Sequence, residues 1–147
     1  FASIVRRCIE SAEQELVDAP ILEDLEEDIC QHLTICYQHD LKHKQFIRLA
    51  IQRSLVDAEM RERLLEQLPL QGSPRVQERL RIHQAAGRIR PEADVVRLSK
   101  QLCVFSSGLV LMAIAMDGMT AEEVRETLAE SARMFAAANK PEVPRVV

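Results

Sequence analysis

The sequence predicts an all-α protein, a single-domain bundle of about seven helices, and three observations support this fold class. Aromatic residues make up only 3% of the 147 residues and tryptophan is absent, so aliphatic residues must build the core, a composition that favours helix over sheet. Apolar residues recur every three or four positions along most of the chain. No segment shows the apolar–polar alternation of a half-buried strand. A chain of this length is expected to form one domain.

The first helix is expected from the N-terminal end of the sequence to Asp18, before Pro20. Its apolar residues lie at helical spacing, and no capping residue precedes them (Phe1, Ile4, Val5, Cys8, Ala12 and Leu16). A helical pattern without an N-terminal cap predicts that this segment begins inside a longer helix.

Three further helices are expected before the clearest break in the chain. The second runs from about Ile21 to His39, with acidic residues in its first turns. Asp40 is predicted to cap a third helix that ends near Leu55, and Asp57 to cap a fourth over 58–68. Proline and glycine residues between 69 and 74 then interrupt the pattern.

The fifth helix is predicted to begin with Ser73 as cap and Pro74 in the first turn, and to stop at Gly87 in a left-handed conformation. The sixth runs from Val95 to Met116, and the seventh from Thr120, which with Glu123 forms a capping box, to about residue 137. We expect the domain to span residues 1–140 and residues 141–147 to form a flexible tail.

The sixth helix carries two apolar stripes. One follows a strict three–four alternation (Val95, Leu98, Leu102, Phe105, Leu109, Met112 and Met116), and the other lies beside it (Val96, Cys103, Val110 and Ile114). A helix with two apolar stripes must be buried on more than one side, either at the centre of a large core or across a subunit interface. We therefore predict that the last two helices form a four-helix bundle with a second copy, as a homodimer.

Charge and cysteine content point to a soluble cytoplasmic protein. The net charge of −4 argues against a nucleic-acid surface on this chain. The four cysteines form no CxxC pair and are interpreted as free thiols in a reducing compartment. No signal peptide is visible, and the apolar segment Leu102–Met116 is shorter than the roughly 20 residues that span a bilayer, so no membrane contact is expected.

No motif indicates an enzyme or a cofactor. Phosphate-binding glycine loops and the GxSxG elbow are absent, and scattered Ser, His and Asp residues do not suggest a triad. The arginines between Arg75 and Arg97 alternate with acidic residues, which is more typical of a solvated, salt-bridged helix face than of a phosphate-binding patch.

One group of residues allows a metal-binding interpretation. His32, Cys36, His39 and His43 would share one face of a continuous helix, and such ligands suit Zn²⁺. If Asp40 caps a new helix, however, His43 swings away. We therefore expect no metal site and interpret the histidines as structural or solvent-facing.

Two further polar residues have both a structural and a functional interpretation. His83 lies on the apolar side of its helix, where it is either a core histidine bonded to a backbone carbonyl or a polar group in an apolar ligand cavity. Tyr37, the only tyrosine, has the same ambiguity.

Five segments, taken in order, resemble the TetR family of transcriptional repressors. FASIVRRCIESAEQE (1–15) resembles the family's linking helix, and the stretch from Tyr37 to Leu49 resembles its "Y…HP" corner, with Asp40 where proline is common. DAEMRERL (57–64) is similar to the short "D-P-x-x-R" helix, and QAAGRIRP (84–91) to a turn between two helices. GLVLMA (108–113), with the helix from Thr120 to Ala137, resembles the closing pair that dimerises.

The resemblance implies an effector-binding and dimerisation domain without the N-terminal helix-turn-helix head of the family. A small hydrophobic or amphipathic effector would enter a cavity among the first, second, fifth and sixth helices and tilt the first helix, which sets the spacing of two heads on operator DNA. The expected effector-binding residues are Leu33, Tyr37, His83, Phe105, Leu109 and Met112. The expected dimer residues are Val96, Cys103, Val110, Val124, Leu128, Ala132 and Phe135, and the two stripes of the sixth helix could be exchanged between pocket and partner.

Two other interpretations remain open. A ligand-free helical module for protein–protein interaction predicts a fully packed interior, whereas the repressor interpretation predicts a sizeable apolar cavity. An enzyme or a metal-carrying bundle would need convergent carboxylates or bound metal.

Overall fold

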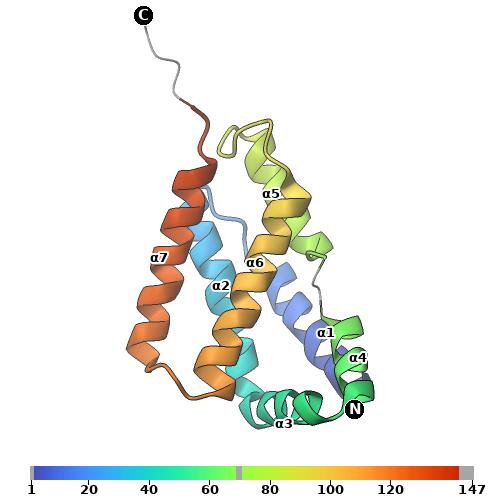
Figure 1. Cartoon of the computed structure of the whole chain (residues 1–147). Coiled ribbons are helices and arrows are strands. Elements are labelled where there is room, and N and C mark those ends of the chain that lie inside the picture. Colours follow the sequence, from blue (N-terminus) through green and yellow to red (C-terminus); the bar gives the residue numbers. More distant parts are fainter. Residues whose placement is uncertain (1, 69–70, 143–147) are drawn as a thin grey trace, which may run out of the picture.

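The computed structural model describes residues 2–68 and 71–142, which form seven α-helices, one short π-helix and no strand (Figure 1). The all-α, single-domain prediction is confirmed. The helices are α1 (Ala2–Asp18), α2 (Leu25–Lys42), α3 (Lys44–Val56), α4 (Ala58–Gln67), α5 (Pro74–Ala85), α6 (Val95–Val110), the π-helix η1 (Leu111–Ala115) and α7 (Ala121–Asn139). Three parts of the chain lie outside the described residues: Phe1, residues 69–70, and residues 143–147, which make up most of the predicted tail.

Side-chain caps fix where several helices begin. The Asp57 carboxylate accepts a hydrogen bond from the Met60 amide at 3.0 Å, and Thr120 forms the predicted capping box with Glu123. Gly87 has a φ of +74°, so the predicted left-handed residue after α5 is also confirmed. Ser73 precedes Pro74 as expected, but its side chain makes no capping bond.

The prediction for the second helix was wrong at both ends. It begins at Leu25, where the Asp24 carboxylate accepts from the Glu27 amide at 2.9 Å, and not at Ile21. It also continues through Asp40 to Lys42, so Asp40 is a residue of its last turn and not the cap of the next helix. No proline interrupts the segment at this point, so the backbone hydrogen bonds of the helix can continue.

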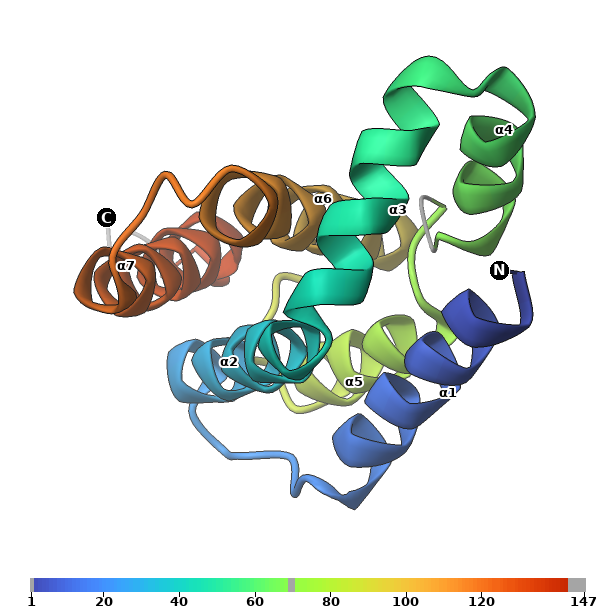
Figure 2. The same ribbon diagram turned by 90° about the horizontal axis from the view of Figure 1, so that it is seen from below.

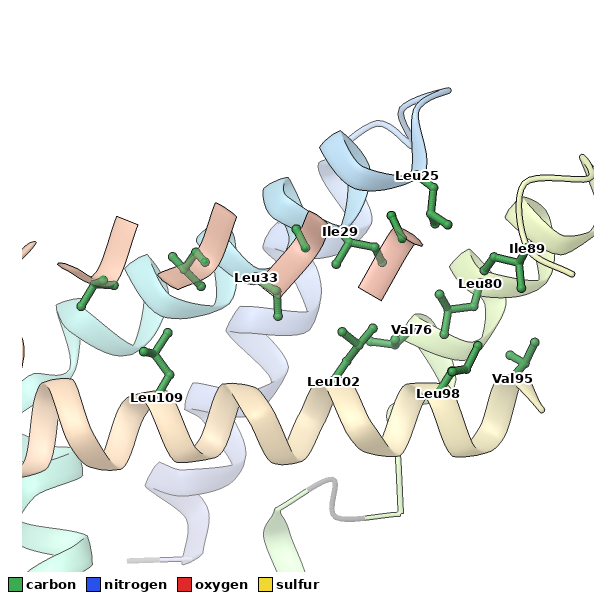
Figure 3. Packing of buried hydrophobic residues seen from close by; sticks show 14 of the residues in the cluster. Leu25, Ile29, Leu33, Val76, Leu80, Ile89, Val95, Leu98, Leu102 and Leu109 are labelled. Carbon is green, nitrogen blue, oxygen red and sulfur yellow. The ribbon is translucent and has the colours of Figure 1, made fainter. Parts of the chain in front are cut away.

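The core lies between α2, α5, α6 and α7. In Figure 3, Leu25, Ile29 and Leu33 of α2 approach Val76 and Leu80 of α5 and the row of leucines on α6. Helix α7 packs along α2, and Val124, Leu128, Ala132 and Ala136 of α7 are buried there. The small side chains of α7 allow the two helices to approach closely.

The π-helix η1 changes which residues of the long apolar helix face the core. A π turn holds one more residue than an α turn and therefore rotates the following side chains around the helix axis. Ala113 and Ile114 are buried, whereas Met112 is 48% and Met116 64% exposed. The first predicted apolar stripe therefore faces the core from Val95 to Leu109, but its last two residues, Met112 and Met116, do not.

Helices α1, α3 and α4 form a second group beside this core. Helix α3 crosses from the end of α2 to α4, and α1 lies near α4, as Figure 2 shows. Among the side chains of α1 that the structure describes, only that of Val5 is buried. Helix α1 is therefore attached more loosely than α2, α6 or α7.

Candidate functional site

A partly open cavity of about 270 Å³, the α1 cavity, lies between α1 and helices α2, α3 and α6. Residues of α4 and α5 complete its lining, and Figure 2 shows how these helices are arranged. Its lining is largely apolar, and most of the half-buried face of α1 belongs to it. The lining residues are Val5, Cys8, Ile9, Ala12, Glu13, Leu16, His32, Cys36, Asp40, His43, Ile47, Ala50, Ile51, Leu64, Leu68, Ser73, Val76, Leu102, Cys103, Ser106, Ser107 and Val110.

A second, more open hollow of about 470 Å³ lies where the end of α1 faces the start of α5. Leu16, His32 and Val76 line both hollows. Its lining includes Arg75, Glu78 and Arg79, so it is more polar than the α1 cavity. Ligand sites are usually concave, mostly apolar and supplied with a few polar groups, a description that the α1 cavity fits better.

A histidine and a carboxylate of the cavity have strongly shifted pKa values. Burial lowers the pKa of His32 to about 4, with a further contribution from the nearby Arg79 charge, so the imidazole is neutral at pH 7. Burial raises the pKa of Asp40 to about 6, opposed by His39. Shifted pKa values in a cavity are a common sign of a functional site.

Three of the four cysteines line the same cavity, as neutral thiols. Burial raises the pKa of Cys36 to about 12, and the negative charge of Asp40 adds to the effect. The pKa values of Cys8 and Cys103 are also raised, chiefly by burial. Because the thiolate is the nucleophile, these thiols are poorly suited to covalent chemistry.

The His/Cys group predicted to share a face of the second helix does not converge. His32 Nε2 lies 3.9 Å from Cys36 Sγ, and the His39 and His43 rings lie with centroids 4.9 Å apart. The expectation that His43 swings away was wrong, because α2 continues past Asp40. Within the described residues no three His, Cys, Asp or Glu side chains are placed to hold a metal ion.

His83 belongs to a buried ionic network and not to the cavity lining. Asp28 is fully buried and accepts hydrogen bonds from Arg79 Nε at 2.7 Å and from His83 Nε2 at 2.7 Å. The Leu22 amide donates to the same carboxylate at 2.7 Å. The core interpretation of His83 is therefore the one that its position supports, with a carboxylate as partner where we expected a carbonyl. Arg79, which the sequence placed on a solvated face, is buried as well.

The other predicted effector residues do not line the α1 cavity. Leu33 and Leu109 are buried in the core, and Tyr37 and Phe105 pack against it. Met112 is exposed on η1. The residues that line the α1 cavity are therefore different from the six that the sequence predicted.

The predicted dimer residues are divided among three environments. Val124, Leu128 and Ala132 are buried within the single chain, and Phe135 packs against the same core. Cys103 and Val110, two residues of the second stripe of α6, line the α1 cavity, whereas Val95, Leu98, Leu102 and Leu109 of the first stripe are buried in the core of the single chain. Val96 is exposed.

Sequence reasoning missed most of the residues of α1 and α3 that line the cavity. The half-buried apolar residues of α1 were recognised as a helical stripe, but nothing local indicates that the stripe faces a hollow and not a packed core. Asp40 was considered only as the residue that stands where the TetR family commonly has proline, and as a helix cap.

The apolar span of this helix is longer than the segment Leu102–Met116 that was compared with the thickness of a bilayer. Val95–Ala115 is long and apolar enough to cross a membrane by length and composition alone, yet its residues Val95, Leu98, Leu102 and Leu109 form part of the core. A core helix of a water-soluble domain satisfies the same test.

Comparison with protein families gives one match. A sequence model of the family described as "AefR-like transcriptional repressor, C-terminal domain" matches residues 28–141, most of the chain. Neither the comparison with curated proteins nor that with solved structures found a match.

Proposed function

Because the chain belongs to the family of AefR-like transcriptional repressor C-terminal domains, within the TetR family, we propose that it binds a small effector and dimerises. In this proposal effector binding modulates how a helix-turn-helix head, preceding α1, binds operator DNA. The protein would act in the cytoplasm, without catalysis of its own.

The observation that carries this proposal is the α1 cavity. A cavity of about 270 Å³ lies just below the volume range typical of drug-sized ligands, about 300–1,000 Å³. A purely structural interaction module would need no such hollow. The cavity therefore favours an effector-binding domain over the ligand-free alternative.

The attachment of α1 explains how an effector would act. Val5, Cys8, Ile9, Ala12 and Leu16 of α1 face the cavity, so their packing depends on what fills it. On the neighbouring turn, Glu15 accepts from Lys42 at 3.2 Å and lies 3.2 Å from His39 Nδ1, both on α2. An effector that packs against α1 would change its tilt relative to α2, and a preference of a few kcal/mol for one tilt would shift operator occupancy.

The homodimer is proposed to form through the exposed apolar face of α6, η1 and α7. This face, named the closing face, comprises Val104, Leu111, Met112, Met116 and Met134, all of which are at least 42% exposed in the single chain. Gly108 lies between Val104 and Leu111, and an added Cβ there would meet nothing within 4 Å. A small residue in an exposed apolar face allows a second helix to approach closely.

Binding of a neutral fluorescent probe, N-phenylnaphthylamine, tests the effector site. We expect the wild type to bind the probe and Ala12→Phe, which fills the cavity from α1, to lose most of the binding. Ser11→Phe is the matched control, because Ser11 is the exposed neighbour on the same helix and does not line the cavity. Equal binding by the two variants, with helical content unchanged by circular dichroism, would remove the cavity as the site.

A further inference from the structure

We propose that the effector is a small lipophilic cation, with the Asp40 carboxylate as its counter-ion in the cavity. This inference rests on the proposed function, since it names the chemical class that the effector cavity accepts. It follows from the charges of the lining, from the lack of a partner for Asp40 and from the character of the remaining polar groups.

The charged residues of the lining are acidic. Asp40 and Glu13 line the cavity, and no lysine or arginine among the described residues does. The two lining histidines are His32, which is neutral at pH 7, and His43. An anionic ligand would therefore meet negative charge without a permanent positive charge to offset it.

Asp40 has no partner of its own in the part of the chain that the structure describes. Its half-buried carboxylate forms none of the side-chain hydrogen bonds or ion pairs found there. The nearest basic residues along α2, His39 and Lys42, pair with Glu15, and His39 acts on Asp40 only through its charge. A half-buried carboxylate without a bonded partner is costly, so a cationic group brought by a ligand would gain a favourable interaction.

Asp40 lies among groups from both sides of the cavity. Its negative charge acts on the thiol of Cys8 in α1 and on that of Cys36 in α2, and raises the pKa of each. A cation beside Asp40 would therefore lie between α1 and α2. This is the position from which a ligand can alter the tilt of α1.

Two other chemical classes fit the three thiols less well. Soft metal ions need several converging ligands, and no three suitable side chains converge within the described residues. Electrophiles need a thiolate, which burial and Asp40 disfavour at these cysteines. As neutral, polarisable groups, the thiols instead suit the apolar part of an amphiphile.

The test compares three ligands with similar chains and different head-group charge: octyltrimethylammonium, decanol and decanoate. Displacement of N-phenylnaphthylamine from the 147-residue protein gives the three affinities. We expect octyltrimethylammonium to bind roughly tenfold more tightly than decanol, and decanoate most weakly. Asp40→Asn should abolish the tenfold preference and leave the affinity for decanol unchanged. Glu10→Gln, which removes an exposed acid of α1 outside the cavity, is the control and should keep the preference.

The outcomes separate this inference from the proposed function. Binding of decanol without any preference for the cation, or a preference that survives in Asp40→Asn, would overturn the cationic effector and leave the effector cavity in place. Binding of none of the three ligands, nor of the probe, would overturn both.

Discussion

Asp28 joins three segments of the chain through one buried carboxylate. Arg79 donates to both of its oxygens, His83 donates from α5, and the Leu22 amide donates from the α1–α2 connection. Burial alone would raise the pKa of Asp28, but the bonds from Arg79, Leu22 and His83 outweigh it and lower the pKa. The stability that this network supplies is therefore present at neutral pH and is lost as the pH falls through the lowered pKa.

Asp40 has the opposite effect on stability. Its pKa in the folded chain, about 6, lies above the ordinary value of 3.8, so folding favours the protonated form. The stabilising contribution is complete below the ordinary pKa and is lost as the pH rises through about 6. At neutral pH the charged carboxylate thus reduces stability, which is typical of residues that are kept for binding.

We therefore expect Asp40→Asn to raise the free energy of unfolding at pH 7.5 by about 2 kcal/mol. Near pH 3.5 the same substitution should have almost no effect, because Asp40 is then protonated in the folded chain and mostly protonated in the unfolded chain. Urea unfolding at the two pH values measures the difference between variant and wild type. The lowered pKa of His32 gives the opposite pH dependence of stability. Because His32 is present in both proteins, its contribution cancels in the difference between variant and wild type. A gain of equal size at both pH values would show that the charge of Asp40 is not its cause.

At the scale of the element, the join of α6 and η1 decides which apolar side chains are inside. An uninterrupted α-helix would continue the stripe of Leu102 and Leu109 to Met112 and Met116. The π turn places Ala113 and Ile114 against the core instead, and Ile114 is fully buried. The Arg48 guanidinium donates to the Ile114 carbonyl at 2.7 Å and pairs with Asp117, so α3 contacts this turn directly.

This register predicts unequal effects of two neighbouring substitutions. Ile114→Ala should reduce the free energy of unfolding by about 3 kcal/mol, since it opens a cavity in a packed region. Met112→Ala should cost less than about 1 kcal/mol, because its side chain is half exposed. Both are compared in urea in a Val104→Glu background, which removes the proposed dimer contact. If Met112→Ala reduced the free energy of unfolding more than Ile114→Ala, the result would favour an uninterrupted α-helix.

At the scale of the whole molecule, α6, η1 and α7 carry several exposed apolar side chains. Val104, Met116 and Met134 are 54%, 64% and 63% exposed, and all belong to the closing face. Single apolar residues on a surface need no explanation, but apolar residues gathered on one face mark an interface, and this is the arrangement that we propose for the closing face. Because α6 also lines the cavity from its other side, the same helix would connect effector and partner subunit.

We expect the wild type to be a dimer in size-exclusion chromatography with light scattering, and Val104→Glu to be a monomer or a dimer weakened at least tenfold. A buried, unpaired carboxylate on each copy would oppose association. Val56→Glu is the matched control, because Val56 is 85% exposed at the end of α3, away from the closing face. A monomeric wild type, or equal weakening by the two variants, would contradict this interface.

The sequence alone determined the fold class, the number of α-helices and several of their ends, because apolar periodicity and caps such as Asp57 and Thr120 are local properties. It also identified the family, through the order of five short segments. Only the tertiary structure decided which face of α6 lines a hollow, that Val124 and Leu128 pack within one chain, and that Asp40 lies unpartnered in the cavity. These features depend on how the helices pack against one another, and an apolar stripe has the same sequence whether it faces a core, a cavity or a second subunit.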